Sequence, residues 1–175
     1  MCVVGRREPV QSGVHDENTS KIGDQESMHT NMETEPNFAD NRPIDEVDVR
    51  YVRLYADAAG ESHFEDVRTL LSQTDFAPPA PPVYLSAFAS AQRWAFLRLP
   101  AEWASEWHPV PHRQVFFWLA GEIEATVSDG EVRRFPAGTV VLVEDTAGKG
   151  HCSRAIGGAV TAAVVQLWVT DGVGR

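Results

Sequence analysis

Residues 107–121 read WHPVPHRQVFFWLAG, and this stretch decides the fold prediction. In a β-strand, side chains two positions apart lie on the same face. An extended conformation therefore places two imidazoles, a carboxamide and two large aromatic rings on one face: His108, His112, Gln114, Phe116 and Trp118, together with Val110. Polar groups at the mouth with aromatic bulk behind them are typical of the wall of a barrel cavity. The two prolines in the stretch cannot donate ladder hydrogen bonds, so its first part is expected at an edge of the sheet.

Short β-forming runs continue on both sides of this stretch. The run 49–57 alternates and is followed by a turn and a second run at 62–71, which predicts a hairpin. The Asp129-Gly130 pair between two alternating runs predicts a second hairpin. Further strands are expected at 93–100, 111–121, 122–130, 131–138, 139–145, 151–156 and 159–169. Many short strands with Gly and Pro between them predict an all-β sandwich or small barrel.

Two segments interrupt this pattern. Residues 76–87 (FAPPAPPVYLSA) contain four prolines, which exclude a helix and a central strand, so this segment is expected to cross an edge or one end of the sheet. Residues 101–107 (AEWASEW) have a helical pattern of one or two turns. Trp103 and Trp107 in this segment would either cap the mouth of a cavity or cover the sheet.

Length and charge bound the domain organisation and the partners. A chain of 175 residues is long enough for one domain with a hydrophobic core. Its formal charge of −10 argues against nucleic-acid and anionic-membrane partners. More than half of the acidic excess lies in the first 50 residues, so we expect a disordered acidic tail over 1–45 and a single β-barrel domain over 46–170. No secretory signal or membrane span is recognisable, and we expect a cytoplasmic protein.

Two motifs in this sequence resemble those of the cupin superfamily. The first cupin motif is HxH, three or four residues, Glu, six residues and Gly; its positions are occupied here by His108, Val110, Gln114 and Gly121. The second motif closes with PxGxxH, which TAGKGH at 146–151 matches except for Thr in place of Pro. The resemblance covers residues 48–168 and extends to small single-domain bacterial cupins. It implies an all-β jelly-roll barrel.

In cupins, three histidines and a glutamate bind a divalent metal. Carried over position by position, the resemblance implies metal ligands at His108, Gln114 and His151, with iron, nickel, manganese or zinc as the ion. Val110 stands where the family has its second histidine, and a neutral carboxamide replaces the carboxylate, so the implied set is weaker than that of the family. His112, on the same predicted face, is the imidazole nearest to the missing position. Metal binding and its absence both stay open.

The leading functional hypothesis is a small-molecule enzyme of the cupin type, with His108 and His151 as catalytic residues. The candidate substrate-binding residues are His112, Gln114, Phe116, Trp118 and Trp107. With a metal, the resemblance implies dioxygenation, isomerisation or cyclisation; without one, the two imidazoles would act as general acid and base, because imidazole titrates near neutral pH. The alternative is a metal-free small-molecule-binding or sensor module without catalysis. A homodimer is implied by the resemblance alone.

Several of these residues also have a structural interpretation. Gln114 would equally hydrogen-bond a ligand or a water, and Phe116 and Trp118 would equally belong to the core. Asp145 either stabilises its turn or, if it faces His108 or His151, completes an acid–base pair. Cys152 alternates away from His151, so no Cys/His nucleophilic pair is expected.

Overall fold

The computed structural model describes residues 47–168. Within this range the chain is all-β, as predicted, and has no helix that could cross a membrane. Its strands are β1 (Asp48–Ala56), β2 (Ser62–Leu70), β3 (Ser72–Thr74), β4 (Val83–Leu85), β5 (Ala91–Leu99), β6 (Gln114–Val127), β7 (Val132–Pro136), β8 (Val140–Val143) and β9 (His151–Leu167). The tail predicted over 1–45 lies outside the described residues, as do positions 46, 169 and 170 of the predicted domain.

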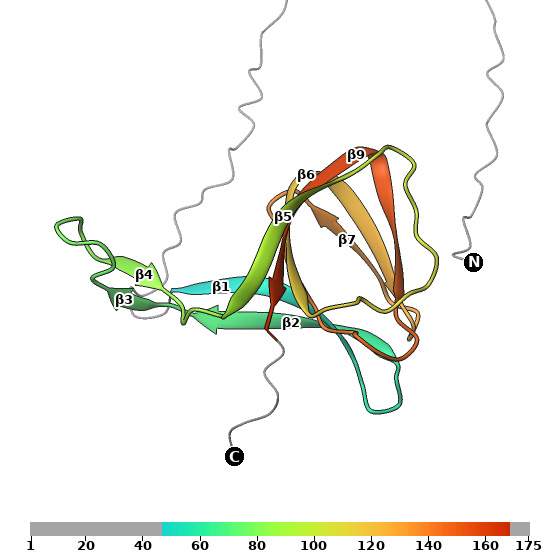
Figure 1. Cartoon of the computed structure of the whole chain (residues 1–175), viewed down its shortest axis with the longest axis horizontal. Helices are drawn as coiled ribbons and strands as arrows, with labels where there is room; N and C mark the ends of the chain where they lie inside the picture. The colour runs from blue at the N-terminus through green and yellow to red at the C-terminus, as the bar shows by residue number, and fades with distance from the viewer. Residues whose placement is uncertain (1–46, 169–175) are drawn as a thin grey trace, which may run out of the picture. The chain divides into compact units, whose positions relative to one another are not determined.

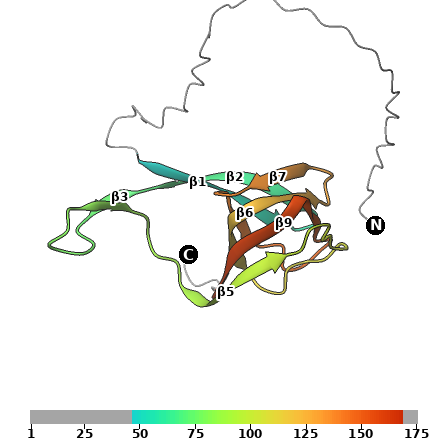
Figure 2. The same cartoon turned by 90° about the horizontal axis from the view of Figure 1, so that it is seen from above.

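Seven of these strands form one sheet. Their order is β2-β1-β8-β6-β9-β5, and β7 pairs with β6 beside this path. β1 and β8 run parallel, whereas the other pairs are antiparallel. Seen from above, β1, β2 and β7 lie on one side and β5 on the other, with β6 and β9 between them (Figure 2). The sheet therefore folds over and encloses an interior.

The enclosed side chains form one apolar core. Along the second half of β6 every second side chain is buried, which is the period of a strand with one face toward the interior. The core consists of Leu54, Phe64, Leu99, Val110, Trp118, Ile123, Ala125, Val127, Phe135, Val141, Val143, Val160 and Ala162. Burying apolar surface of this kind contributes roughly 25 cal/mol per Å².

Both predicted hairpins are present. β1 and β2 pair antiparallel over their whole length. In their turn, the Asp57 carboxylate accepts hydrogen bonds from the amides of Ala59 and Glu61, each at 2.9 Å. Local bonding of this type is the reason Asp is favoured in turns. β6 and β7 are joined through Asp129-Gly130, where Gly130 has a φ of 98°.

The strands predicted at 111–121 and 122–130 are a single strand, β6, which begins only at Gln114. Its pairing with β9 shifts register twice next to Gly121. Gly121 has a φ of 78°, and an added Cβ would lie 2.6 Å from the carbonyl oxygen of Ala159. Such an irregularity bends a strand without ending it. The strands predicted at 151–156 and 159–169 are likewise a single strand, β9.

The helix predicted at 101–107 is wrong. This segment runs beside β9, where the Ser105 amide donates to the Ser153 carbonyl at 2.8 Å and the Ala155 amide donates to the Trp103 carbonyl at 2.9 Å. A helix of one or two turns is marginal by itself. Hydrogen bonds to β9 give these backbone groups partners. In so short a helix, most of them would have none.

The proline-rich segment does not cross the main sheet. It forms the loop and the second strand of a separate two-stranded hairpin, β3 and β4, which Figure 1 shows away from β6 and β7. The prolines lie between the two strands, where no ladder hydrogen bond is required of them. The prediction that this segment contains no central strand is confirmed, and the predicted edge crossing is replaced by the hairpin.

Candidate functional site

His151, the first residue of β9, forms a buried pair with Asp145. Its Nδ1 lies 2.7 Å from Oδ2 of Asp145, and the two side chains are 10% and 0% exposed. A carboxylate can only accept, so Nδ1 carries the hydrogen and Nε2 is the acceptor nitrogen of the neutral ring. The carboxylate therefore fixes both the tautomer and the orientation of the imidazole.

His108 lies next to this pair, on the segment that precedes β6. The backbone amide of each histidine donates to the carbonyl of the other, at 3.0 and 3.1 Å. Their ring centroids are 5.1 Å apart, with a tilt of 44° between the planes. Nδ1 of His108 donates to the Glu106 carbonyl at 2.8 Å, so Nε2 is also the acceptor nitrogen of this ring. The structure thus places the two histidines predicted as catalytic side by side.

Glycines in the TAGKGH turn allow this close approach. Gly150 has a φ of 72°, and a Cβ there would overlap the backbone carbonyl of His108. A Cβ at Gly148, whose φ is 86°, would overlap the backbone of Gly60 in the β1–β2 turn. The turn that carries His151 is therefore fixed against two neighbouring segments by backbone contact.

A cavity of about 60 Å³ lies inside the barrel beside His151. Its wall consists of Leu54, Phe116, Trp118, Ile123, Ala125, Phe135, Val141, Val143, His151 and Ser153. Two buried polar atoms near this region, Nε1 of Trp118 and Oδ1 of Asp145, have no hydrogen-bond partner among the described residues. One water requires roughly 10–15 Å³ by this measure. The cavity therefore has room for a few waters or for a group of a few non-hydrogen atoms.

Phe116 and Trp118 both belong to the cavity wall. Their rings stack with centroids 5.2 Å apart and 5° between the planes. Trp118 is also part of the apolar core, so the two interpretations of this residue apply together. Trp103 packs against the core, whereas Trp107 is 38% exposed.

Gln114 and His112 lie outside the wall of the interior cavity. Gln114 is buried, but its Oε1 accepts a hydrogen bond from Nε2 of Gln166 at 3.3 Å, and it is absent from the cavity wall. His112 is exposed and lines a separate pocket on the outside of the barrel. The predicted alternation holds only from Gln114 onward, because Pro109 and Pro111 keep the preceding segment out of the ladder.

The side chains around His151 do not fit a cupin metal centre. Within residues 47–168, no group of three or more His, Cys, Asp or Glu side chains is placed to hold a metal ion. Val110, at the position of the family's second histidine, is buried in the apolar core. Gln114 and His151 lie at opposite ends of the β6–β9 ladder. The implied ligands His108, Gln114 and His151 therefore do not converge on one point.

Asp145 is the site residue whose role the sequence left open. Its position before the TAGKGH turn was the available signal, but only the fold shows that its carboxylate is directed at His151. Ser153 and Val143, which also line the cavity, have no feature that separates them from other strand residues. Cys152 is 1% exposed and is not a free thiol.

No family model matches the sequence, and no curated protein matches it. Solved structures do match. The cupin domain of Cnp3 from Schizosaccharomyces pombe is 16% identical with a TM-score of 0.37, over 75% of this chain and 96% of that chain. An ethanolamine utilization protein Q from Salmonella typhimurium is 14% identical with a TM-score of 0.31, over 69% and 97%. Protein NMB1881 from Neisseria meningitidis is 16% identical with a TM-score of 0.33, over 43% and 74%.

The bridge between His108 and His151 joins the two cupin-like motifs in one site, as the sequence resemblance predicts. The described residues form an all-β fold, as predicted. At these identities and TM-scores, the solved structures carry no inference about the activity of this chain. The function of this domain has to be argued from its own residues.

Proposed function

We propose that this cupin-type domain is a small-molecule enzyme that works by acid–base chemistry at His151 and His108 without a bound metal. The observation that carries the proposal is the buried pair of His151 and Asp145 at the wall of the interior cavity. An imidazole oriented by a buried carboxylate is the arrangement that holds a general base in position in hydrolytic triads.

Each residue of the site has a separate role in the proposed reaction. Nε2 of His151 acts as the general base, and Asp145 stabilises the imidazolium that forms when it takes a proton. His108, whose ring centroid is 5.1 Å from that of His151, acts as the general acid in its imidazolium form, in which Nε2 also carries a proton. Phe116 and Trp118 keep the reacting group away from bulk water.

The cavity volume limits the substrate. Only a reacting group of a few non-hydrogen atoms fits the space of about 60 Å³, so the rest of the substrate lies outside this cavity. Of the reactions that the cupin resemblance implies, isomerisation and cyclisation can proceed through proton transfers alone. The expected substrate is therefore a compact ketone or aldehyde with an acidic α-proton.

Solvent-deuterium exchange tests this proposal. The full chain is incubated in D₂O with a panel of compact ketones and aldehydes, and deuterium incorporation at the α-carbon is followed by ¹H NMR. We expect exchange above the buffer rate for at least one compound, and a loss of about 100-fold or more in His151→Gln. His63→Gln, which changes a histidine on β2 that is absent from the cavity wall, is the control. Exchange that His151→Gln leaves unchanged contradicts the assigned base.

Metal analysis tests the second part of the proposal. Protein purified without a histidine tag is expected to contain no stoichiometric iron, nickel, manganese or zinc by plasma mass spectrometry. A stoichiometric ion that is lost in His151→Gln would show that the site is a metal centre after all.

The alternative function is a binding or sensor module without catalysis. The apolar wall of the cavity, in which His151 is the one ionisable side chain, is the observation that favours it. Binding detected as a shift of the Trp118 indole resonance, with no exchange for any bound compound, would support this alternative over the enzyme.

A further inference from the structure

We propose that a pocket on the outer face of the barrel binds a small molecule through a carboxylate or phosphate group. This outer pocket has a volume of about 380 Å³ and is lined by Arg53, Tyr55, Ala56, Pro111, His112, Arg113, Glu144 and Thr146. It shares no lining residue with the interior cavity. The proposal is therefore independent of the function proposed above.

The size and position of the outer pocket suit a ligand site. Small-molecule sites typically measure about 300–1,000 Å³, a range that includes this pocket and excludes the interior cavity. Its walls come from three segments: the outward-facing side chains of β1, the segment that precedes β6, and the residues that follow β8. Leu54, between Arg53 and Tyr55, faces the interior, so the two pockets lie on opposite sides of β1.

Two guanidinium groups in the outer pocket share one carboxylate. Nε of Arg53 and Nε of Arg113 each donate to a different oxygen of Glu144. Burial by itself would raise the pKa of Glu144, but the hydrogen bonds from Arg53 and Arg113 lower it, so this carboxylate stays ionised and positions both arginines. Glu65 also accepts from Nη1 of Arg53 at 2.9 Å, but it is not part of the pocket wall. Among the lining side chains, two positive charges therefore face one negative charge.

The chemistry of these side chains selects an oxyanion. The contact with Glu144 uses one of the five N–H donors of Arg113. The planar fork of a guanidinium matches two oxygens of a carboxylate or phosphate, and such charge-assisted bonds are stronger than neutral ones. The Arg53 guanidinium carbon lies 4.4 Å from the centroid of the Tyr55 ring, a cation–π contact that also restrains this arginine. His112 and Thr146 add further hydrogen-bonding groups to the wall.

The overall charge of the chain bears on how an anion would bind to this pocket. The chain has a formal charge of −10, which disfavours general association with anions. Affinity for an oxyanion must therefore come from local contacts with the arginines, and it should depend on their geometry as well as on their charge.

The test is a titration of the full chain by isothermal calorimetry with two probes, inorganic phosphate and succinate, at constant ionic strength with sodium chloride as the reference. We expect saturable binding of at least one probe, and the lower Kd distinguishes phosphate from carboxylate recognition. Arg113→Gln is expected to raise that Kd about tenfold or more, because it removes a charge-assisted pair. Arg113→Lys keeps the charge but not the planar guanidinium. Its Kd is expected to lie between those of the wild type and Arg113→Gln.

Arg133→Gln is the matched control. Arg133 also pairs with two carboxylates, Glu131 and Asp66, but lies outside the outer pocket, so its substitution should leave the Kd within about twofold. If circular dichroism shows that Arg113→Gln does not fold, the exposed His112→Gln substitution replaces it, with a smaller expected rise in Kd. Absence of saturable binding for both probes, or an equal loss in Arg133→Gln, overturns the proposal.

Discussion

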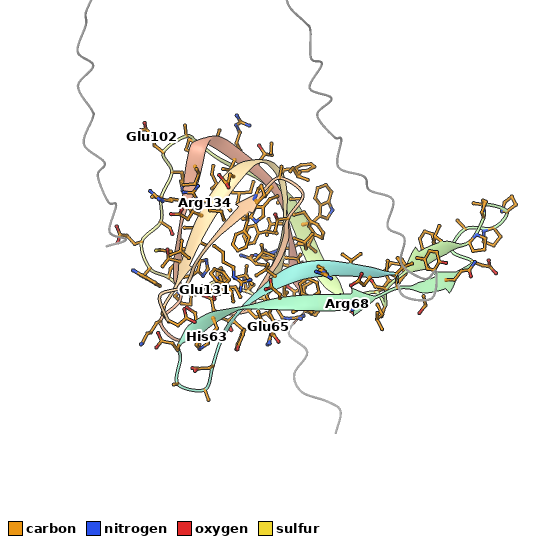
Figure 3. All side chains as sticks on the ribbon, turned by 180° about the vertical axis from the view of Figure 1, so that it is seen from behind. His63, Glu65, Arg68, Glu102, Glu131 and Arg134 are labelled. Atoms are coloured by element: carbon orange, nitrogen blue, oxygen red, sulfur yellow. The ribbon has the colours of Figure 1, made fainter. Side chains whose placement is uncertain are left out.

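At the residue scale, His63 is held between carboxylates from two different turns. Its Nδ1 lies 2.6 Å from Oδ2 of Asp129, and its Nε2 lies 3.3 Å from Oδ2 of Asp57. Figure 3 shows His63 close to the β1–β2 turn. Hydrogen bonds to Asp129 and to Asp57 raise the pKa of His63. The protonated imidazole therefore links the β1–β2 turn to the β6–β7 turn.

We predict that His63→Gln removes a pH-dependent part of the stability. Because folding raises the pKa of His63, its contribution is fully present below the unfolded pKa of about 6.5 and is lost as the pH rises through the folded pKa. Between pH values of about 5.5 and 8, the wild type should therefore lose more stability than the variant. Urea unfolding followed by tryptophan fluorescence measures this, with the exposed His112→Gln as the control. The same pH dependence in wild type and His63→Gln would refute the prediction.

Asp145→Asn is predicted to affect both stability and exchange activity. The carboxamide removes a charge-assisted bond from a fully buried position, which should cost about 1–3 kcal/mol in the free energy of unfolding. It can also present an N–H to Nδ1 of His151 and so favour the wrong tautomer, which should lower α-proton exchange more than tenfold. Urea unfolding and deuterium exchange measure the two effects. A variant that keeps full exchange activity would remove Asp145 from the positioning role.

At the element scale, the hairpins could be predicted and the strand lengths could not. Asp57 and Asp129-Gly130 are local signals, because the turn depends on the residues within it. The fusion of two predicted strands into β6 depends instead on the contact of Gly121 with Ala159, which is distant in the sequence. The segment 101–107 was misassigned for the same reason, since its hydrogen-bond partners lie on β9.

Gly150→Ala is predicted to destabilise the fold more than Gly130→Ala. Both glycines have positive φ, of 72° and 98°, so both substitutions carry a backbone cost of about 1–2 kcal/mol. A Cβ at Gly150 would in addition overlap the backbone of His108, whereas nothing lies within 4 Å of one at Gly130. The difference in urea midpoint between the two variants therefore isolates the contact between the motif segments. Equal midpoints would show that the turn can move away from His108 at little cost.

At the scale of the whole described domain, β5 is one end of the strand order, with β2 at the other. Trp94 and Phe96 on this strand are 67% and 70% exposed, and their rings meet edge to face with centroids 5.4 Å apart. An edge strand with exposed aromatic side chains favours pairing with another chain. Cyclic two-fold symmetry, the commonest in oligomers, would bring two copies of β5 together.

We therefore predict a homodimer that pairs through β5. Trp94→Lys places a charge at this edge and should shift the protein to the monomer in sedimentation velocity or light-scattering measurements. Phe88→Lys, which removes an aromatic side chain that is 78% exposed but outside β5, should leave the dimer intact. A wild-type monomer at high protein concentration would contradict the prediction.

The candidate site could be predicted only in part. The pairing of His108 with His151 follows from the spacing of the two cupin-like motifs, and Phe116 and Trp118 follow from the period of β6. The positions of Gln114 and His112 cannot be predicted from the sequence, because they depend on where β6 begins and on how the barrel closes. The sequence does not indicate the outer pocket either, since Arg53 and Arg113 come from distant segments and meet only at Glu144.

Glu144 and Asp145 are consecutive, yet one holds two arginines outside the barrel and the other holds His151 inside it. Consecutive side chains therefore lie on opposite sides of the barrel wall at this point. The insertion or deletion of one residue here would exchange the inward and outward positions, as a register slip does in any strand. The guanidinium pair would then lose its carboxylate and the imidazole would lose its partner at once. The segment between β8 and β9 is therefore restricted in length as well as in sequence.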